Sequence, residues 1–381
     1  MRRVLLLSAA RTPIARAGGL LQGLSEQELA ARAMAETLRR AKLDGGVRID
    51  EVILGVARQT SLPSNCARHA ALLAGIPESV PAYTVQRHGA SGLQAVLNGF
   101  FAIGCGDADF ILAGGAESIS QVPREIQNAR YHFDADTEIV FDPIHNQQIC
   151  AQPVDRYGKL TPQELSEEMA RRYEISLEAQ RQYARDSAQR WRGHCTEDVI
   201  APVEVMRKKK PLSVTSDEAS LEDTLLPPLG DGAALCALAA EDQAMALDLP
   251  VMAELVSAGM GAASPLDSAA AAVGAARQAL ALAGTATAEL DFVEIHELSA
   301  AHVLAVAGGL GLTGDGMGKV NPAGGALAQS YPWGAAGAVL VGRAAARIAR
   351  GEGRVGLVVM PAESGQGLAL LMRRWKGEGT V

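Results

Sequence analysis

Short apolar runs alternate with longer segments of helical periodicity along most of the chain. Buried strands, bounded by Gly, Asp or Pro, are predicted at residues 4–7, 51–56, 110–113 and 355–360. Helices rich in Ala, Leu and Glu are predicted at residues 26–40 and 266–283. Alternating strands and helices predict an α/β protein with parallel or mixed sheets that helices cover on both faces.

Two distant segments end in the same three residues. Residues 110–118 and 356–364 both run from a buried strand into the sequence A-E-S. The blocks that contain them, about 1–120 and 250–381, are also similar in length. Together these features indicate an internal duplication.

The segment between the two blocks differs in composition. From about residue 121 to 224 the chain is polar and charged, and one helical region is predicted at residues 161–191, with Thr161 as N-cap and Pro162 at the first helical position. This segment is interpreted as an inserted loop domain, and residues 231–238 are expected to return to the first sheet. The basic run at 207–210 is typical of a solvated turn, with a phosphate-bearing ligand as the alternative.

Size and charge limit the classes of function. With 381 residues, the chain exceeds a single compact core, which favours several domains or one duplicated architecture. Its hydrophobic fraction of 48% favours folding by burial alone. The net charge of −8 offers no broad field for nucleic acid or an anionic membrane, so neither is expected as a partner.

The cysteines indicate a reducing compartment. The chain has five of them, an odd number with no C-x-x-C pair, so neither a disulfide framework nor a metal site is expected. No apolar stretch is long enough to cross a bilayer. The apolar run after Met1 resembles a short signal peptide, but Arg11 ends it, and we interpret it as the first buried strand. A cytoplasmic location is expected.

Several motifs resemble one family in that family's order. They are S-A-A-R-T-P-I at 8–14, N-C-A-R at 65–68, G-D-A-D at 106–109, A-G-G-A-E-S at 113–118, H-E at 296–297 and N-P-A-G-G-A at 321–326. On these motifs the chain resembles the thiolase superfamily, which includes acetyl-CoA acetyltransferases and 3-ketoacyl-CoA thiolases, from end to end.

The resemblance implies a thiolase fold. Two βαβαβαββ halves would form five layers, with residues 1–120 and 231–249 in the N-terminal half, 121–230 in the loop domain and 250–381 in the C-terminal half. It also implies a CoA thioester as ligand with no cofactor required. The assembly would be a homodimer or homotetramer, or a hetero-oligomer with an active thiolase.

The family's nucleophile is absent from its motif. V-N-x-x-C-x-S-G-L corresponds to residues 85–93, and Gly89 stands in place of the acylated cysteine. Glycine supplies a backbone N–H but no nucleophile, so no acyl-enzyme can form at this position. The resemblance thus identifies a degenerate member of the family.

The proton-transferring cysteine is also replaced. The motif C-x-G-G-G-x-G corresponds to residues 361–367, where Pro361 occupies the cysteine position and has neither an acid–base group nor an N–H. Glu363 and Ser364 replace two glycines that bring backbone donors to the substrate, and Gly365 keeps the third. The second oxyanion hole of the family is therefore in question.

The activating histidine is exchanged for a phenol, whereas a neighbouring motif survives. G-H-P-x-G becomes S-Y-P-W-G at 330–334, so Ser330 and Tyr331 stand where Gly and His are usual. Tyr331 can donate a hydrogen bond but is a poor base, because its reference pKa is about 10. His296 and Glu297 retain the H-E of the family's H-E-A-F motif, although Leu298 and Ser299 follow instead of Ala and Phe.

Other candidate groups have simpler explanations. His88, next to Gly89, is interpreted as a hydrogen-bonded residue at the pocket edge, with a catalytic base as the alternative. His302 is expected to pack or to face solvent. All five cysteines are expected to be buried structural thiols: Cys66, Cys105, Cys150, Cys195 and Cys236.

Three functions remain open. The first is an acyl-CoA-handling protein without ordinary thiolase turnover, because Gly89, Tyr331 and Pro361 replace the catalytic groups. The second is an enzyme of altered mechanism, in which Tyr331 and His296 support retro-aldol cleavage or a non-covalent condensation. The third is an active acetyl-CoA acyltransferase with an unconventional nucleophile.

Overall fold

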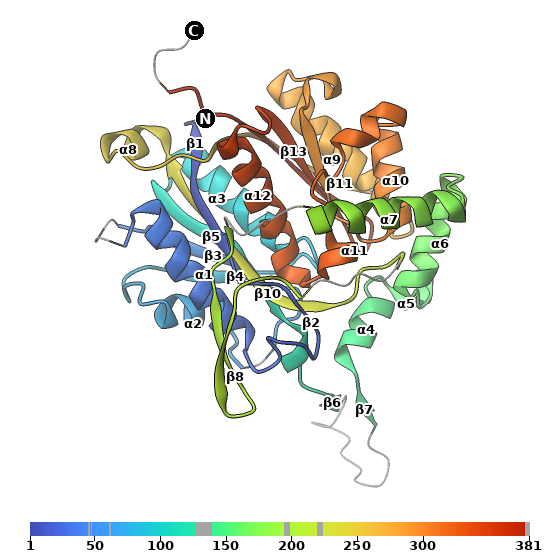
Figure 1. Cartoon of the computed structure of the whole chain (residues 1–381), viewed down its shortest axis with the longest axis horizontal. Coiled ribbons are helices and arrows are strands. Elements are labelled where there is room, and N and C mark those ends of the chain that lie inside the picture. Colours follow the sequence, from blue (N-terminus) through green and yellow to red (C-terminus); the bar gives the residue numbers. More distant parts are fainter. Residues whose placement is uncertain are drawn as a thin grey trace.

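Two halves with the same order of strands make up most of the molecule (Figure 1). The computed structural model describes residues 1–44, 46, 48–60, 62–126, 139–193, 199–218 and 224–377. In the N-terminal half the order is β4-β3-β5-β10-β1. Its elements are β1 (Val4–Arg11), β2 (Ala15–Arg16), α1 (Glu26–Ala41), β3 (Glu51–Gly55), α2 (Cys66–Leu73), β4 (Ala82–Val85), α3 (Ser91–Cys105), β5 (Phe110–Ser118) and β10 (Gly230–Ala240).

The C-terminal half repeats this plan. Its strand order is β12-β13-β14-β11, and Val320 adds an isolated parallel bridge to Val293 where the N-terminal half has β4. Its elements are β11 (Ala253–Ala262), α9 (Ser268–Ala283), β12 (Phe292–Ile295), α10 (Ala300–Gly309), α11 (Ala326–Gln329), α12 (Trp333–Arg350), β13 (Val355–Ala362) and β14 (Gln366–Arg373), and the short α8 (Glu241–Ala246) precedes them. The shared order agrees with the predicted duplication.

The two halves are joined into one ten-stranded sheet. Strand β1 pairs with β11 in antiparallel register over three residues, Val4 to Leu6. The first strand thus has β10 on one edge and β11 on the other, which makes the sheets of the two halves continuous. The layer order is as predicted: α1 and α2 cover one outer face, α9 and α10 the other, and α3 packs against α12 in the middle.

The two central helices explain the Ala- and Gly-rich composition. Helix α12 is buried without interruption from Trp333 to Ile348, and α3 is buried over most of its length. Helices that are apolar on every side belong inside a protein. They also approach closely, since a Cβ on Gly92 of α3 would lie 2.4 Å from the carbonyl oxygen of Gly334. Small residues at this crossing bring the beginnings of the two helices together.

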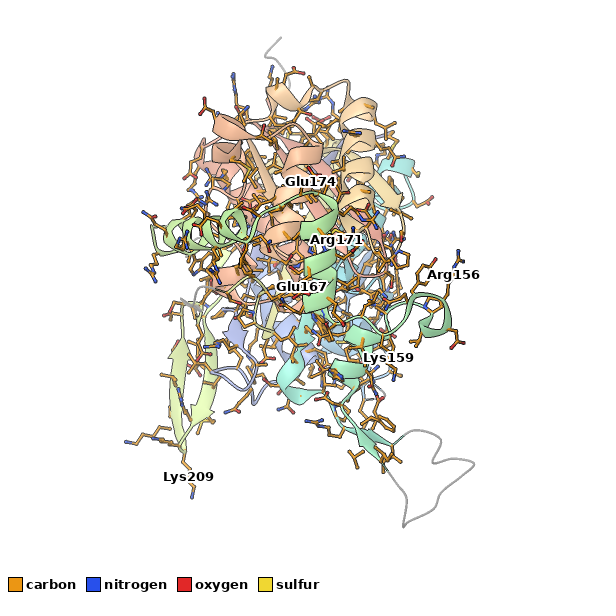
Figure 2. All side chains as sticks on the ribbon, turned by 90° about the vertical axis from the view of Figure 1, so that its right-hand side faces the viewer. Arg156, Lys159, Glu167, Arg171, Glu174 and Lys209 are labelled. Carbon is orange, nitrogen blue, oxygen red and sulfur yellow. The ribbon has the colours of Figure 1, made fainter. Side chains whose placement is uncertain are left out.

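The helices of the inserted segment, within residues 143–193, lie on one side of this body, and its hairpin at residues 203–214 projects from the lower end (Figures 1 and 2). The predicted helix at 161–191 is two helices, because Glu174 adopts a left-handed conformation and breaks it. The Thr161 cap and Pro162 at the first helical position are confirmed. Within the described residues its elements are β6 (Glu125–Ile126), β7 (Val140–Phe141), α4 (Pro143–Ile149), α5 (Val154–Tyr157), α6 (Pro162–Arg172), α7 (Leu177–Gly193), β8 (Val203–Arg207) and β9 (Lys210–Val214).

The basic run lies at the tip of the β8–β9 hairpin. Lys208 and Lys209 form its turn, and Figure 2 shows Lys209 projecting away from the body. The four cationic side chains are exposed, which agrees with the solvated turn predicted for them.

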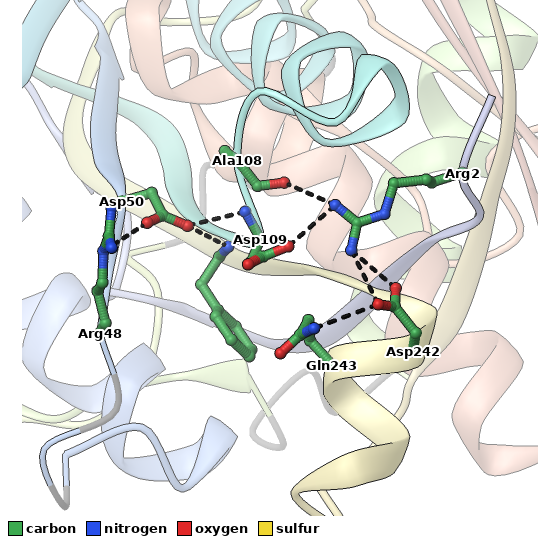
Figure 3. A network of polar contacts seen from close by, with 8 residues as sticks. Arg2, Arg48, Asp50, Ala108, Asp109, Asp242 and Gln243 are labelled. Carbon is green, nitrogen blue, oxygen red and sulfur yellow. Dashed lines mark hydrogen bonds and ion pairs between the residues drawn. The ribbon is translucent and has the colours of Figure 1, made fainter.

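A charged network closes the end of the sheet where β5 begins (Figure 3). Arg2 forms ion pairs with Asp109 at 2.9 Å and Asp242 at 2.8 Å. Asp50 accepts the backbone N–H groups of Asp109 and Phe110 at 2.8 and 3.0 Å. The candidate site lies near the opposite end of β5.

None of the helices in the described ranges is both long enough and apolar enough to span a membrane.

Candidate functional site

The hydroxyl group of Tyr331 lies in the space that a side chain at position 89 would occupy. Gly89 lies two residues before α3, and Tyr331 lies two residues before α12. A Cβ atom added to Gly89 would lie 1.5 Å from Tyr331 Oη and 2.8 Å from its Cζ. No atom of this size fits at such distances. Gly89 and Tyr331 are therefore complementary, and the predicted loss of the nucleophile is accompanied by loss of its space.

Glu363 binds both of these residues. One carboxylate oxygen, Oε1, accepts the Tyr331 hydroxyl at 3.2 Å, and the other, Oε2, accepts the backbone N–H of Gly89 at 3.1 Å. Glu363 follows directly after β13, in the segment that the family gives to glycines. The backbone N–H of Gly89 thus already donates to a carboxylate. The sequence marked Glu363 as a pocket residue but not as this acceptor.

The internal duplication contains a second copy of this arrangement. The four-residue sequences that begin at Gly89 and Gly334 read G-A-S-G and G-A-A-G, and they begin the two central helices. The N–H of Gly334 donates to Glu117 Oε2 at 2.9 Å, as that of Gly89 donates to Glu363. Glu117 and Glu363 belong to the two A-E-S segments. Glu363 thus accepts a backbone N–H at the beginning of α3, as Glu117 does at the beginning of α12.

Burial determines the protonation of these groups. It raises the pKa of Glu117 to about 7, although three backbone N–H groups oppose the shift. Burial, and then the neighbouring Glu363 carboxylate, raise the pKa of the Tyr331 hydroxyl well above its ordinary value. Tyr331 is therefore a neutral donor near pH 7 and no base.

His296 lies beside Tyr331 without a hydrogen bond to it. The two rings are tilted by 49° with their centroids 4.3 Å apart. Burial, followed by His302 and Arg343, lowers the pKa of His296 to about 3, so the ring is neutral. Its Nε2 atom is buried and has no hydrogen-bond partner among the described residues. The Tyr331 hydroxyl donates to Glu363 instead.

Glu297 is held by hydrogen bonds from the inserted segment and from the C-terminal half. Its carboxylate accepts the hydroxyl groups of Tyr183 and Ser187, both at 2.7 Å, and the backbone N–H of Leu327 at 2.7 Å. Tyr183 and Ser187 belong to α7, so this buried carboxylate fastens the inserted segment to the C-terminal half. Asn321 adds a longer contact of 3.4 Å.

The other residues predicted for the site at the end of β13 and just after it lie around the site rather than in it. Pro361 is buried in β13 opposite Gly367 of β14. The Ser364 hydroxyl donates to the carbonyl oxygen of Ala151 in the inserted segment. Gly365 has a φ of +67°, and a Cβ there would lie 2.3 Å from a backbone oxygen, so glycine is required.

Ser330 and His88 precede the two central helices. Ser330 has a positive φ of 94°, and its buried Oγ has no partner within the described part of the chain. His88 also has a positive φ, 46°, and its carbonyl oxygen accepts the Ser91 hydroxyl at 2.5 Å. Its ring is half-buried.

A small cavity of about 60 Å³ adjoins Tyr331 and Glu363. Its remaining lining residues come from the inserted segment, from the stretch before β10 and from the C-terminal half: Gln148, Pro162, Leu165, Leu226, Pro227, Leu229, Leu298, His302 and Trp333. A pocket for a whole drug-sized ligand measures about 300–1,000 Å³. A whole ligand of that size therefore does not fit in this space.

His302 lines the cavity, whereas we expected it to pack or to face solvent. Its Nδ1 lies 2.7 Å from the hydroxyl oxygen of Ser299, which caps α10 by accepting the backbone N–H of His302. Burial lowers the pKa of His302 to about 4. The only sequence signal for His302 was Ser299, which replaces the family's Phe. A serine that caps a helix lies close to the third residue of that helix, which here is His302.

No described cysteine lines the cavity. Cys66 and Cys236 are buried, and burial raises the pKa of Cys236 to about 12 and that of Cys66 well above its ordinary value. Cys105 and Cys150 are exposed, so the expectation of buried thiols is wrong for these two. Cys195 lies outside the described residues.

The fold and this site define an α/β protein of duplicated halves whose two central helices begin next to each other, with Gly89 against Tyr331. The sequence matches the family descriptions "Thiolase, N-terminal domain" over residues 4–234 and "Thiolase, C-terminal domain" over residues 249–374. The chain therefore belongs to the thiolase family.

Similar proteins include active thiolases by name. A beta-ketoadipyl-CoA thiolase of Escherichia coli is 33% identical, covering 98% of this chain and 100% of that protein. An acetyl-CoA acetyltransferase of Pseudomonas aeruginosa is 32% identical over 98% of this chain and 100% of its own length. Among solved structures, a Bacillus anthracis acetyl-CoA acetyltransferase superposes with a TM-score of 0.91 and 27% identity, covering 98% of this chain and 99% of that one. The structure of human mitochondrial 3-ketoacyl-CoA thiolase superposes with a TM-score of 0.89 and 28% identity, and the same shares of the two chains are covered. Such structures agree with the predicted thiolase fold.

Proposed function

We propose that this chain binds an acyl-CoA thioester but does not form an acyl-enzyme. The observation that carries the proposal is the position of Tyr331 Oη, 1.5 Å from the place of a Cβ at Gly89. Family membership supports the CoA thioester as ligand. The occupied nucleophile position supports the loss of ordinary turnover.

The contacts of Glu363 support the same conclusion. Thiolase chemistry develops negative charge on the thioester oxygen and needs donors preplaced for it. The Gly89 N–H would be such a donor, but it already donates to Glu363 Oε2. A developing oxyanion would have to displace a carboxylate and would be repelled by it.

The replacements form one interlocked unit. Gly89 leaves room for the Tyr331 hydroxyl, this hydroxyl donates to Glu363, and Glu363 accepts the Gly89 N–H. Pro361 removes the second acid–base group nearby. A binding subunit, alone as a homo-oligomer or beside an active thiolase, is the role we infer from this combination.

Turnover of acetoacetyl-CoA with CoA tests the proposal. An ordinary thiolase serves as the positive control, and calorimetry with acetyl-CoA checks binding. We expect binding, and turnover lower than the control by more than about a hundredfold, equivalent to about 3 kcal/mol of barrier. A rate within that factor refutes the proposal.

One observation favours a second candidate, an enzyme that uses acid–base chemistry without a thiol. Tyr331, Glu363 and His302 line the same cavity, so a hydroxyl group there would meet both a carboxylate and an imidazole. Retro-aldol cleavage of a hydroxylated thioester fits such groups. If Tyr331→Phe leaves every detected activity unchanged, this candidate fails.

A further inference from the structure

The cavity beside Tyr331 combines an apolar wall with four polar side chains. Leucine, proline and tryptophan side chains form most of the wall, whereas Gln148, Tyr331, Glu363 and His302 lie around the same 60 Å³ space. The amide of Gln148 can both donate and accept, so it does not by itself select between ligand groups. A volume of this size holds about four water-sized groups. Tyr331 and His302 are each only 3% exposed, so a ligand group entering the cavity would be desolvated together with them.

Two of the polar groups offer only acceptors. The single proton of the Tyr331 hydroxyl is given to Glu363, which leaves an oxygen lone pair. The Glu363 carboxylate accepts this proton and the Gly89 N–H and has further lone pairs. A ligand group that approaches Glu363 must therefore donate a hydrogen bond.

The third polar group offers a donor. The Ser299 oxygen accepts the backbone N–H of His302, and within the described ranges His302 Nδ1 is the acceptor within reach of the Ser299 hydroxyl proton. The Ser299 hydroxyl therefore donates to Nδ1. A neutral imidazole whose Nδ1 accepts carries its proton on Nε2. The opposite nitrogen of the ring is thus a donor.

We propose that this cavity selects a short acyl group that carries a hydroxyl, which donates to Glu363 and accepts from His302 Nε2. This inference rests on the proposed function and names the ligand class of the same site. A carbonyl or a methyl group cannot donate to Glu363. A terminal carboxylate, such as the acyl group in the name of the beta-ketoadipyl-CoA relative, would be repelled by it.

Calorimetry with four CoA thioesters of equal acyl length tests the inference on the wild-type protein. The probes are butyryl-CoA, 3-hydroxybutyryl-CoA, acetoacetyl-CoA and succinyl-CoA. We expect 3-hydroxybutyryl-CoA to bind at least about tenfold more tightly than butyryl-CoA, because a hydrogen bond to a charged group contributes enough for a tenfold change. Succinyl-CoA should bind most weakly.

Two variants test whether the preference for 3-hydroxybutyryl-CoA depends on His302 or changes with any substitution. His302→Leu should lose the preference for 3-hydroxybutyryl-CoA, measured within this variant as the ratio of its affinities for 3-hydroxybutyryl-CoA and butyryl-CoA. Ser299→Ala keeps the imidazole of His302 but removes the hydroxyl group that bonds to its Nδ1. The preference should then fall severalfold. This variant replaces His302→Leu if that variant does not fold. His145→Leu, in α4 and absent from the cavity wall, is the matched control and should retain the preference.

The outcomes distinguish the two proposals. If no thioester binds, the proposed function is refuted. If all four bind with similar affinity, or if both variants keep the full preference, the inference is wrong while the proposed function stands. A preference for succinyl-CoA would also overturn the inference.

Discussion

The contact between positions 89 and 331 can be tested by adding one methyl group. Gly89→Ala would place its Cβ 1.5 Å from Tyr331 Oη, so the phenol must move and its hydrogen bond to Glu363 must break. Gly89 has no positive φ, and the cost therefore comes from the contact and not from the backbone. Overpacking costs about 1–3 kcal/mol and a lost bond to a charged group about 1.5–3 kcal/mol. Because the two effects overlap, we expect a destabilisation of about 2–4 kcal/mol.

Thermal unfolding and a double-mutant cycle measure this effect. At about 2 cal/mol/K of unfolding entropy per residue, 381 residues convert the loss into a decrease in Tm of about 2 to 5 °C. Tyr331→Leu removes the hydroxyl that the methyl group meets. In that background Gly89→Ala should cost less than about 1 kcal/mol, which gives a coupling of about 2 kcal/mol.

A matched glycine provides the control. A Cβ on Gly274 of α9 would meet nothing within 4 Å, so Gly274→Ala should not destabilise the protein and should be slightly stabilising in a helix. If Gly89→Ala costs the same in wild type and in Tyr331→Leu, the two positions are not in contact and the account of the filled site is wrong.

Two further predictions concern buried carboxylates. Glu117 gains a proton on folding between its ordinary pKa of 4.5 and about 7, so the stability it contributes is present at low pH and lost as pH rises through 7. The difference in unfolding free energy between wild type and Glu117→Gln should therefore shrink by about 3 kcal/mol from pH 4.5 to 7.5 in urea titrations, whereas a constant difference would contradict the assigned pKa. Glu297→Gln should weaken the attachment of α7 by about 1.5–3 kcal/mol, because Tyr183 and Ser187 lose a charged acceptor. Faster hydrogen exchange in α7 would show this, and unchanged protection would count against the anchoring role.

The hydrophobic pattern predicted these strands because a buried strand requires a run of apolar residues. Residues 4–7 are all apolar, and the return of the chain to the first sheet at residues 231–238 is apolar after Asp231; both segments lie inside the joined sheet. The break between α6 and α7 was missed because the left-handed Glu174 is not a residue type that signals a turn. The pairing of β1 with β11 depends on how two distant edges meet, and nothing in either strand specifies it.

The candidate site was predicted as a set of positions but not as a set of contacts. Motif order identified Gly89 and Tyr331 as replacements, each considered alone. Their contact joins residues 242 positions apart and needs the central helices to cross, so neither motif could reveal it. His302 was missed for a related reason, because the face of a helix that lines a cavity depends on what packs against the others.

Trapping with an acyl-CoA tests the central claim most directly. The full-length protein is incubated with radiolabelled acetyl-CoA, denatured, and examined by intact-mass spectrometry and peptide mapping, with an ordinary thiolase in parallel. The account predicts a labelled cysteine in the ordinary thiolase and no acyl adduct on this chain, since a tyrosine hydroxyl fills the space of the thiol. A stable acyl group on any of its five cysteines would contradict the account.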